Sequence, residues 1–325
     1  MSYRPYSFRG GFMKIVVLDG FSANPGDLSW EWLSKYGEYE VYDYSRRDEI
    51  VARSDGADAL IINKTKIDAE IVSQLRTVKY VGLLSTGINA IDCDAARECG
   101  ITVSNVPAYS TMSVAQHIFA LLLSVTNGVS EHNLAVKNGK WTASKQFCFY
   151  ETPLVELLGK TFGIVGMGSI GSAAAKIAEA FGMKVIYTSR TQKDFSYEFV
   201  SREELAARSD YIAFCCPLNN ETADYVNDDF IGRCKNGCVI INTSRGGIVD
   251  ENALAAGLDS GKISYALLDV LRQEPPFDGS PLLGREDCVI TPHIAWGTYE
   301  ARARLMEWVE ENLQAFIAGT PRNVV

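Results

Sequence analysis

The sequence lacks several features that mark particular classes of protein. It has no apolar run near the roughly 18 to 20 residues that a helix needs to cross a bilayer. Its 31 lysines and arginines are outnumbered by 40 acidic residues, and the net charge of −9 argues against a nucleic-acid partner. The residues before Met13 carry no apolar stretch typical of a secretory signal. We therefore expect a cytoplasmic protein without a membrane or nucleic-acid partner, in which the residues before Met13 form a disordered extension.

Cysteines at metal-binding spacing are also missing. The eight cysteines form no Cys-x-x-Cys pair, which is the spacing typical of structural zinc sites. Several of them stand in apolar runs, as Cys215 and Cys216 do. We therefore expect reduced, buried thiols and no bound metal.

What the sequence does contain is an alternation of short apolar runs and helical patterns. Strand-like runs occupy residues 13–20, 39–44, 57–64, 79–85 and 101–107, with helical candidates at 67–75 and 91–99. After a long apolar helix predicted at 110–129, strand-like runs resume at 161–168, 184–189, 210–216, 237–244, 263–270 and 287–291. A capping-box pattern at Ser201 and Glu204 predicts a helix start, and the last helix is predicted at about 298–319. This alternation predicts an α/β fold with two parallel sheets, each covered by helices on both faces.

A glycine pattern opens the second group of strands. Gly166, Gly168 and Gly171 fit G-x-G-x-x-G, with a strand-like run before them and a helical pattern after them. Glycine is needed where the chain turns tightly and where its backbone approaches a pyrophosphate. The first amides of the helix, near Ser169 and Ile170, would face the phosphates. The segment therefore predicts a dinucleotide-binding site.

The end of the next strand bears on which dinucleotide binds. An NAD site usually has an acidic residue there, because a carboxylate accepts hydrogen bonds from the ribose hydroxyls. This chain has Ser189, Arg190 and Thr191 instead. A guanidinium and two hydroxyls suit a 2′-phosphate, so we expect NADP(H) to be preferred over NAD(H). The alternative is that Arg190 stacks on the adenine and NADH serves.

The three histidines stand in different patterns. His117 lies inside the apolar helix and is expected to be a core or dimer contact, whereas His132 begins a polar helical face and is expected to be solvated. His293 follows a strand-like run, and so do Arg245 and Glu274. Because the carboxyl ends of parallel strands meet at one edge of a sheet, we expect these last three side chains to gather there, with Glu274 touching His293.

The three residue types suit the chemistry of a carbonyl acid. Arginine presents a planar fork that binds a carboxylate. An imidazole can donate a proton to a developing alkoxide, and a nearby carboxylate favours its protonated form. We therefore expect Arg245, Glu274 and His293 to be catalytic residues.

The order of these motifs resembles that of the D-isomer-specific 2-hydroxyacid dehydrogenase family. The resemblance runs from about residue 80 to 305 and rests on Gly166–Gly171, Asn242–Gly246, Asp269–Pro275 and Thr291–Trp296. Within the family, His293–Trp296 and Ser113–His117 are most similar to the glycerate dehydrogenase or hydroxypyruvate and glyoxylate reductase branch. The resemblance implies a Rossmann cofactor domain at 108–298, inserted in a flavodoxin-like substrate domain made of 1–107 and 299–325. It also implies a homodimer built largely through the helix near 110–129.

The resemblance also implies roles for particular residues. Arg245 would bind the substrate carboxylate, Glu274 would hold His293, and His293 would be the acid/base. The substrate loop contains Ser85, Thr86 and Gly87, whose backbone amides would grip the carboxylate. Near the cofactor we expect Asp269, beside the nicotinamide amide, and Thr243, Cys216 and Pro217. Cys215 and Cys216 stand where the family often has a histidine, so we expect altered packing near the nicotinamide.

The reaction that the resemblance implies is the reduction of a small 2-keto acid, hydroxypyruvate or glyoxylate, to its D-2-hydroxy acid. Two alternatives remain open. One is a D-lactate or D-3-phosphoglycerate type of dehydrogenase. The other is a dinucleotide-sensing interaction protein that resembles the corepressors of the superfamily. The set of Arg245, Glu274 and His293 argues against the second alternative, because a sensor has no need of a proton donor.

Overall fold

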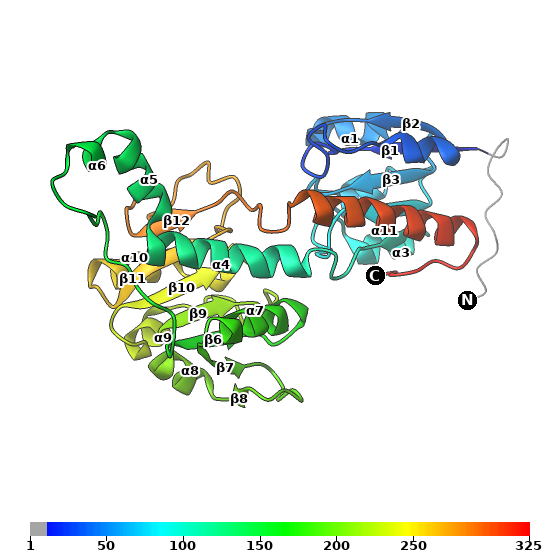
Figure 1. Ribbon diagram of the computed structural model, residues 1–325. Coiled ribbons are helices and arrows are strands. Elements are labelled where there is room, and N and C mark those ends of the chain that lie inside the picture. The colour runs from blue at the N-terminus through cyan, green and yellow to red at the C-terminus, as the bar shows by residue number, and fades with distance from the viewer. Residues whose placement is uncertain (1–11) are drawn as a thin grey trace. The chain divides into compact units, whose positions relative to one another are not determined.

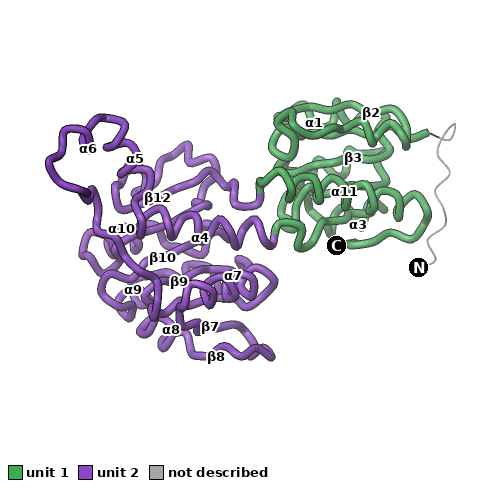
Figure 2. The backbone as a smooth tube through the Cα atoms, in the orientation of Figure 1, with its two compact units in different colours: residues 1–110, 297–325 green, residues 111–296 purple. Residues whose placement is uncertain are grey.

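The computed structural model describes residues 12–325, which form two compact units. Unit 1 consists of the described residues up to Ser110 together with Gly297–Val325, and unit 2 is Thr111–Trp296 (Figure 2). The boundaries predicted from the sequence were 107/108 and 298/299. The prediction of a disordered extension concerns residues 1–11, which lie outside the described part of the chain.

Unit 1 is built on a five-stranded parallel sheet in the order β2-β1-β3-β4-β5 (Figure 1). Its strands are β1 (Met13–Val17), β2 (Gly37–Val41), β3 (Ala59–Ile62), β4 (Tyr80–Leu83) and β5 (Thr102–Ser104). Its helices are η2 (Glu31–Lys35), α1 (Arg47–Arg53), α2 (Ala69–Val72), α3 (Cys93–Glu98) and α11 (Tyr299–Ile317). Tyr80 of β4 stacks on Phe316 of α11 with ring centroids 4.8 Å apart, so the last helix packs on this first sheet. The order 2-1-3-4-5 is the flavodoxin-like one.

Unit 2 holds a seven-stranded parallel sheet in the order β12-β11-β10-β9-β6-β7-β8. Its strands are β6 (Thr161–Val165), β7 (Lys184–Thr188), β8 (Glu198–Phe199), β9 (Tyr211–Phe214), β10 (Cys238–Asn242), β11 (Ile263–Leu268) and β12 (Cys288–Ile290). Its helices are α4 (Thr111–Asn127), α5 (Val129–Lys137), α6 (Lys140–Ala143), α7 (Ser169–Ala180), α8 (Arg202–Arg208), α9 (Asp228–Arg233), η3 (Gly246–Ile248) and α10 (Glu251–Asp259). Counted from β6, the strands follow the Rossmann order with one strand added at the edge.

Both faces of the sheet of unit 2 are buried. Alternate residues of one strand point to opposite sides, so each strand contributes side chains to two cores. Val165 and Ile240 enter a core that contains the apolar side chains of α8, α9 and α10. Their neighbours Ile164 and Ile241 enter a second core with α4 and α7. This confirms the predicted fold class of doubly wound parallel sheets.

The structure differs from the sequence expectations in two local features. The helix expected at 110–129 ends at Asn127, where Gly128 has a φ of 51° and α5 begins. The edge strand β8 was not predicted, because its two residues are exposed and show no apolar alternation.

Within residues 12–325, no single helix is long and apolar enough to cross a bilayer; α4 and α5 meet the length and composition criteria only as a pair bent by 53°.

Two expectations about side chains are wrong. His132 is half-buried rather than solvated: its Nδ1 lies 2.6 Å from Gly128 O, and its Nε2 accepts the backbone N–H of Glu151 at 3.0 Å. Cys99 and Cys148 are exposed, although all eight cysteines are free thiols as expected.

Candidate active site

The candidate catalytic residues follow three strands that lie side by side. β10 pairs with β11 and β11 with β12, all in parallel, so their carboxyl ends share one edge of the sheet. Arg245 follows β10, Glu274 lies in the segment after β11, and His293 follows β12. Ligands of open α/β sheets bind at this edge.

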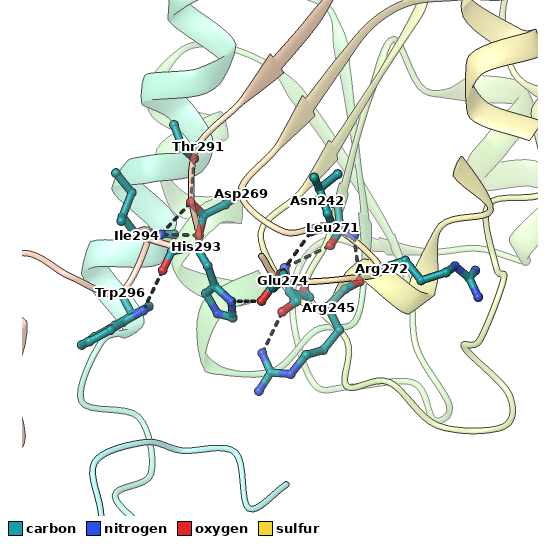
Figure 3. A network of polar contacts seen from close by, with 12 residues as sticks. Asn242, Arg245, Asp269, Leu271, Arg272, Glu274, Thr291, His293, Ile294 and Trp296 are labelled. Carbon is teal, nitrogen blue, oxygen red and sulfur yellow. Dashed lines mark hydrogen bonds and ion pairs between the residues drawn. The ribbon is translucent and has the colours of Figure 1, made fainter. Parts of the chain in front are cut away.

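His293 and Glu274 point toward one another and are in contact, as the order of the motifs predicted (Figure 3). The imidazole Nδ1 lies 2.6 Å from Glu274 Oε2. The other oxygen, Oε1, accepts the backbone N–H of Leu271 at 3.1 Å, which fixes the plane of the carboxylate. With the Nδ1 proton directed to a carboxylate, Nε2 is the ring nitrogen left to face a ligand.

The loop that carries His293 is fixed by Asp269, which is only 1% exposed. Asp269 Oδ1 accepts hydrogen bonds from Thr291 Oγ1 at 2.6 Å and from Ile294 N at 2.9 Å, and Oδ2 accepts one from Ala295 N at 2.8 Å. The backbone N–H of His293 donates to Asp269 O at 2.8 Å. These bonds hold His293 at a φ of 56°, a left-handed conformation that costs a non-glycine residue roughly 1–2 kcal/mol. The predicted contact of Asp269 with the nicotinamide amide stays a prediction.

Two further residues support this loop. His117 of α4 is half-buried, and its Nε2 lies 2.9 Å from Thr291 Oγ1 and 3.6 Å from Asp269 Oδ1. Trp296 Nε1 donates to His293 O at 2.9 Å. Sequence reasoning missed the link through His117, because nothing in an apolar helix shows which side chain meets a loop that lies 174 residues away.

Arg245 is half-buried at the end of a turn that Asn242 stabilises. The Asn242 side chain donates to Arg245 O at 2.9 Å and accepts from Ser244 N at 3.0 Å. The next residue, Gly246, packs against the peptide after Leu271, where a Cβ would lie 1.9 Å from the carbonyl carbon. The turn of Arg245 therefore packs directly on the segment that leads to Glu274.

The glycine motif has the geometry that a pyrophosphate requires. Gly166 has a φ of 98°, and a Cβ there would lie 2.7 Å from Cys215 O. A Cβ on Gly171 would lie 2.2 Å from Gly166 O, whereas one on Gly168 would meet no atom of residues 12–325 within 4 Å. The N-cap residue of α7 is Gly168, which has no side chain with which to cap the helix, so the first amides, from Ser169 and Ile170 onward, are available to phosphates.

The other predicted cofactor residues lie at the carboxyl ends of neighbouring strands. After β7, Ser189 Oγ donates to Thr191 O at 2.7 Å, and the Arg190 side chain is exposed. After β10, Thr243 is 8% exposed, and its hydroxyl has no hydrogen-bond partner among residues 12–325. A buried hydroxyl without a partner is costly, and a bound cofactor could satisfy it.

Cys216 and Pro217 follow β9 in the same sheet. Burial raises the pKa of the Cys216 thiol to about 11, so it is a neutral group at physiological pH. The contact of these two residues with the cofactor stays a prediction.

The predicted substrate loop lies in unit 1, directly after β4. Ser85 Oγ donates to Gly87 O at 2.6 Å, and Thr86 Oγ1 donates to Val106 O at 2.8 Å. Asn105 Nδ2 donates to Thr86 O at 2.8 Å. The loop therefore has a defined shape, and its role in binding a carboxylate stays a prediction.

Comparisons with known proteins agree with the motifs. The family model described as "D-isomer specific 2-hydroxyacid dehydrogenase, NAD binding domain" matches residues 119–295. The chain is 44% identical to a hydroxypyruvate reductase of Blautia hydrogenotrophica over 96% of this chain and 99% of that one. It is 36% identical to a glycerate dehydrogenase of Methylorubrum extorquens over 96% and 98% of the two chains. A solved acyclic imino acid reductase in complex with NADPH and D-Arg has a TM-score of 0.84 and 32% identity, covering 96% and 100%.

Proposed function

Because the chain belongs to the D-isomer specific 2-hydroxyacid dehydrogenase family and is an NAD(P)-dependent oxidoreductase, we propose that it reduces hydroxypyruvate or glyoxylate to the D-2-hydroxy acid. The observation that carries the proposal is the 2.6 Å contact between Glu274 and His293 at the sheet edge where ligands bind. The similarity to a hydroxypyruvate reductase and a glycerate dehydrogenase supports this choice of substrate.

In this proposal each residue has one task. The bound cofactor would supply the hydride that reduces the carbonyl carbon. His293 donates a proton from Nε2 to the carbonyl oxygen, and Glu274 on Nδ1 orients the ring for that transfer. Arg245 pairs with the substrate carboxylate through its guanidinium. In the direction of oxidation, the same imidazole accepts the proton.

For the cofactor we propose a preference for NADP(H). The exposed Arg190 guanidinium and the hydroxyls of Ser189 and Thr191 follow β7, where an NAD site usually has a carboxylate. A guanidinium attracts a 2′-phosphate, and no acidic side chain among these three residues would repel it.

For the quaternary state we propose a homodimer, as the resemblance implies, but one that uses residues 129–158, here called the arm, rather than largely the helix near 110–129. The arm exposes large apolar side chains, which are Val129, Leu134, Val136, Trp141, Phe147, Tyr150, Leu154, Val155 and Leu158. Where exposed apolar side chains gather into one patch, that patch marks a site of association with another chain. A second copy of the chain is the partner that the family resemblance implies.

A spectrophotometric screen tests the proposed reaction. Glyoxylate, hydroxypyruvate and pyruvate are each combined with NADPH and with NADH, and the oxidation of the cofactor is followed. We expect the highest kcat/KM with hydroxypyruvate or glyoxylate and with NADPH. A clear preference for pyruvate would contradict the proposed substrate, and a clear preference for NADH would contradict the proposed cofactor.

A further inference from the structure

One carboxylate outside the proposed mechanism holds both ends of the segment that carries Glu274. Between the buried residues Leu271 and Leu282 the chain leaves the core, and residues 272–275 are exposed. Glu251 Oε1 accepts the backbone N–H of Arg272 at 2.7 Å, at the start of this segment. Near its end, Ser280 Oγ donates to Glu251 Oε2 at 2.6 Å. A single side chain therefore contacts the segment 272–280 at both of its ends.

Glu251 is itself held in place by the start of α10. It is the first residue of that helix, and the preceding Asp250 caps it. The Asp250 carboxylate accepts the backbone N–H groups of Asn252 at 2.9 Å and Ala253 at 3.2 Å. A capped helix start is a firm anchor, so the position of Glu251 does not depend on the segment that it contacts.

Arg272 also lies close to the turn that carries Arg245, another candidate catalytic residue. The Arg272 side chain donates to Val249 O at 3.0 Å and forms an ion pair with Asp224. The peptide that joins Leu271 to Arg272 packs against Gly246, next to Arg245. Leu271 and Arg272 therefore contact three groups. Arg272 N donates to Glu251, Leu271 N donates to the Glu274 carboxylate, and the peptide between them packs on the turn of Arg245.

We propose that Glu251 is a positioning residue, which holds the segment 272–280 so that Glu274 meets His293. None of these hydrogen bonds joins Glu251 directly to His293 or Glu274. Glu251 acts instead through the backbone of Arg272 and the Ser280 hydroxyl. Without it, the exposed segment has more freedom and the Glu274 carboxylate spends less time on Nδ1. The proposal rests on the proposed role of His293 as acid/base.

The first test compares two substitutions of Glu251. Glu251→Ala removes both contacts and should lower kcat about tenfold or more, because small displacements of catalytic groups are costly. The Kd of the reduced cofactor should stay within about twofold of the parent value, since no glycine-motif contact changes. Glu251→Gln should restore most of kcat, because its carbonyl can accept from Arg272 N while its NH2 donates to Ser280 Oγ. Glu286→Ala, an exposed carboxylate that precedes β12, serves as a control with parental kcat.

A double-mutant cycle separates positioning from a general loss of structure. In a Glu274→Gln background, Glu251→Ala should lower kcat by less than about twofold, because the carboxylate that it positions is already absent. The proposal is overturned if Glu251→Ala lowers kcat by less than about threefold in the parent. It is also overturned if Glu251→Ala lowers kcat by the same factor in the Glu274→Gln background. If Glu251→Ala does not fold, Ser280→Ala goes through the same cycle with the same criteria. A His293→Ala variant that keeps parental turnover would instead refute the proposed function.

Discussion

The isosteric substitution Asp269→Asn tests how the structure holds the loop of His293. Asp269 is 1% exposed and accepts three hydrogen bonds, from Thr291 Oγ1, Ile294 N and Ala295 N. An asparagine keeps one acceptor and turns an amide N–H toward a backbone donor. Two buried donors, the new amide N–H and the backbone N–H that it faces, then lack an acceptor. Each costs about 1–3 kcal/mol, so we expect a loss of about 4 kcal/mol in the free energy of unfolding. No cavity arises, because the two side chains have nearly the same shape.

Urea denaturation and calorimetry measure this loss. For a unit of this size, 1 kcal/mol corresponds to a shift of about 2–4 °C in Tm, so the expected fall is about 8–16 °C. Asp278→Asn is the matched control, because that exposed carboxylate bonds only with Gln273 among the contacts that the structure describes. It should change stability by less than about 0.5 kcal/mol. An Asp269→Asn protein within about 1 kcal/mol of the parent would refute the assignment of Asp269 as the anchor of this loop.

Three further predictions concern the cofactor, the thiols and the dimer. Arg190→Ser should lower kcat/KM for NADPH about tenfold, the equivalent of about 1.4 kcal/mol, and leave that for NADH within about twofold; equal losses for both would contradict the proposed contact. Because burial raises the pKa of Cys216 to about 11, iodoacetamide at pH 7.5 should alkylate the exposed Cys99 well before Cys216, and labelling of Cys216 should rise with pH up to about 11. Mass spectrometry after timed labelling follows both thiols, and modification of Cys216 as early as that of Cys99 would contradict this prediction. Phe147, with 91% of its surface exposed, should be needed for association: Phe147→Ser should give monomers in light scattering, whereas the control Phe277→Ser should stay dimeric.

The sequence predicted those features that depend on periodicity and on order along the chain. Apolar runs marked most strands, and the glycine pattern marked the turn at Gly166, which needs a positive φ. The contact between Glu274 and His293 could be expected because each residue follows one of two successive strands of a parallel sheet.

Features that depend on packing between distant segments could not be predicted in this way. The contact of His117 with Thr291 joins a helix to a loop, and helical periodicity shows only that His117 lies in an apolar helix. The two contacts of Glu251 depend on how the segment after β11 folds back over α10. His132 looked solvated because its neighbours in the sequence are polar, but its ring is fixed by the backbone of Glu151.

The central claim is that His293 transfers the proton, and one measurement tests it most directly. Steady-state turnover of His293→Ala is compared with that of the parent on the best substrate of the screen, and the Kd of NADPH is measured for both by fluorescence. We expect kcat to fall by about 10²–10⁴-fold while the Kd of NADPH stays within about twofold, because the imidazole acts on the substrate oxygen. Turnover within tenfold of the parent would contradict the account.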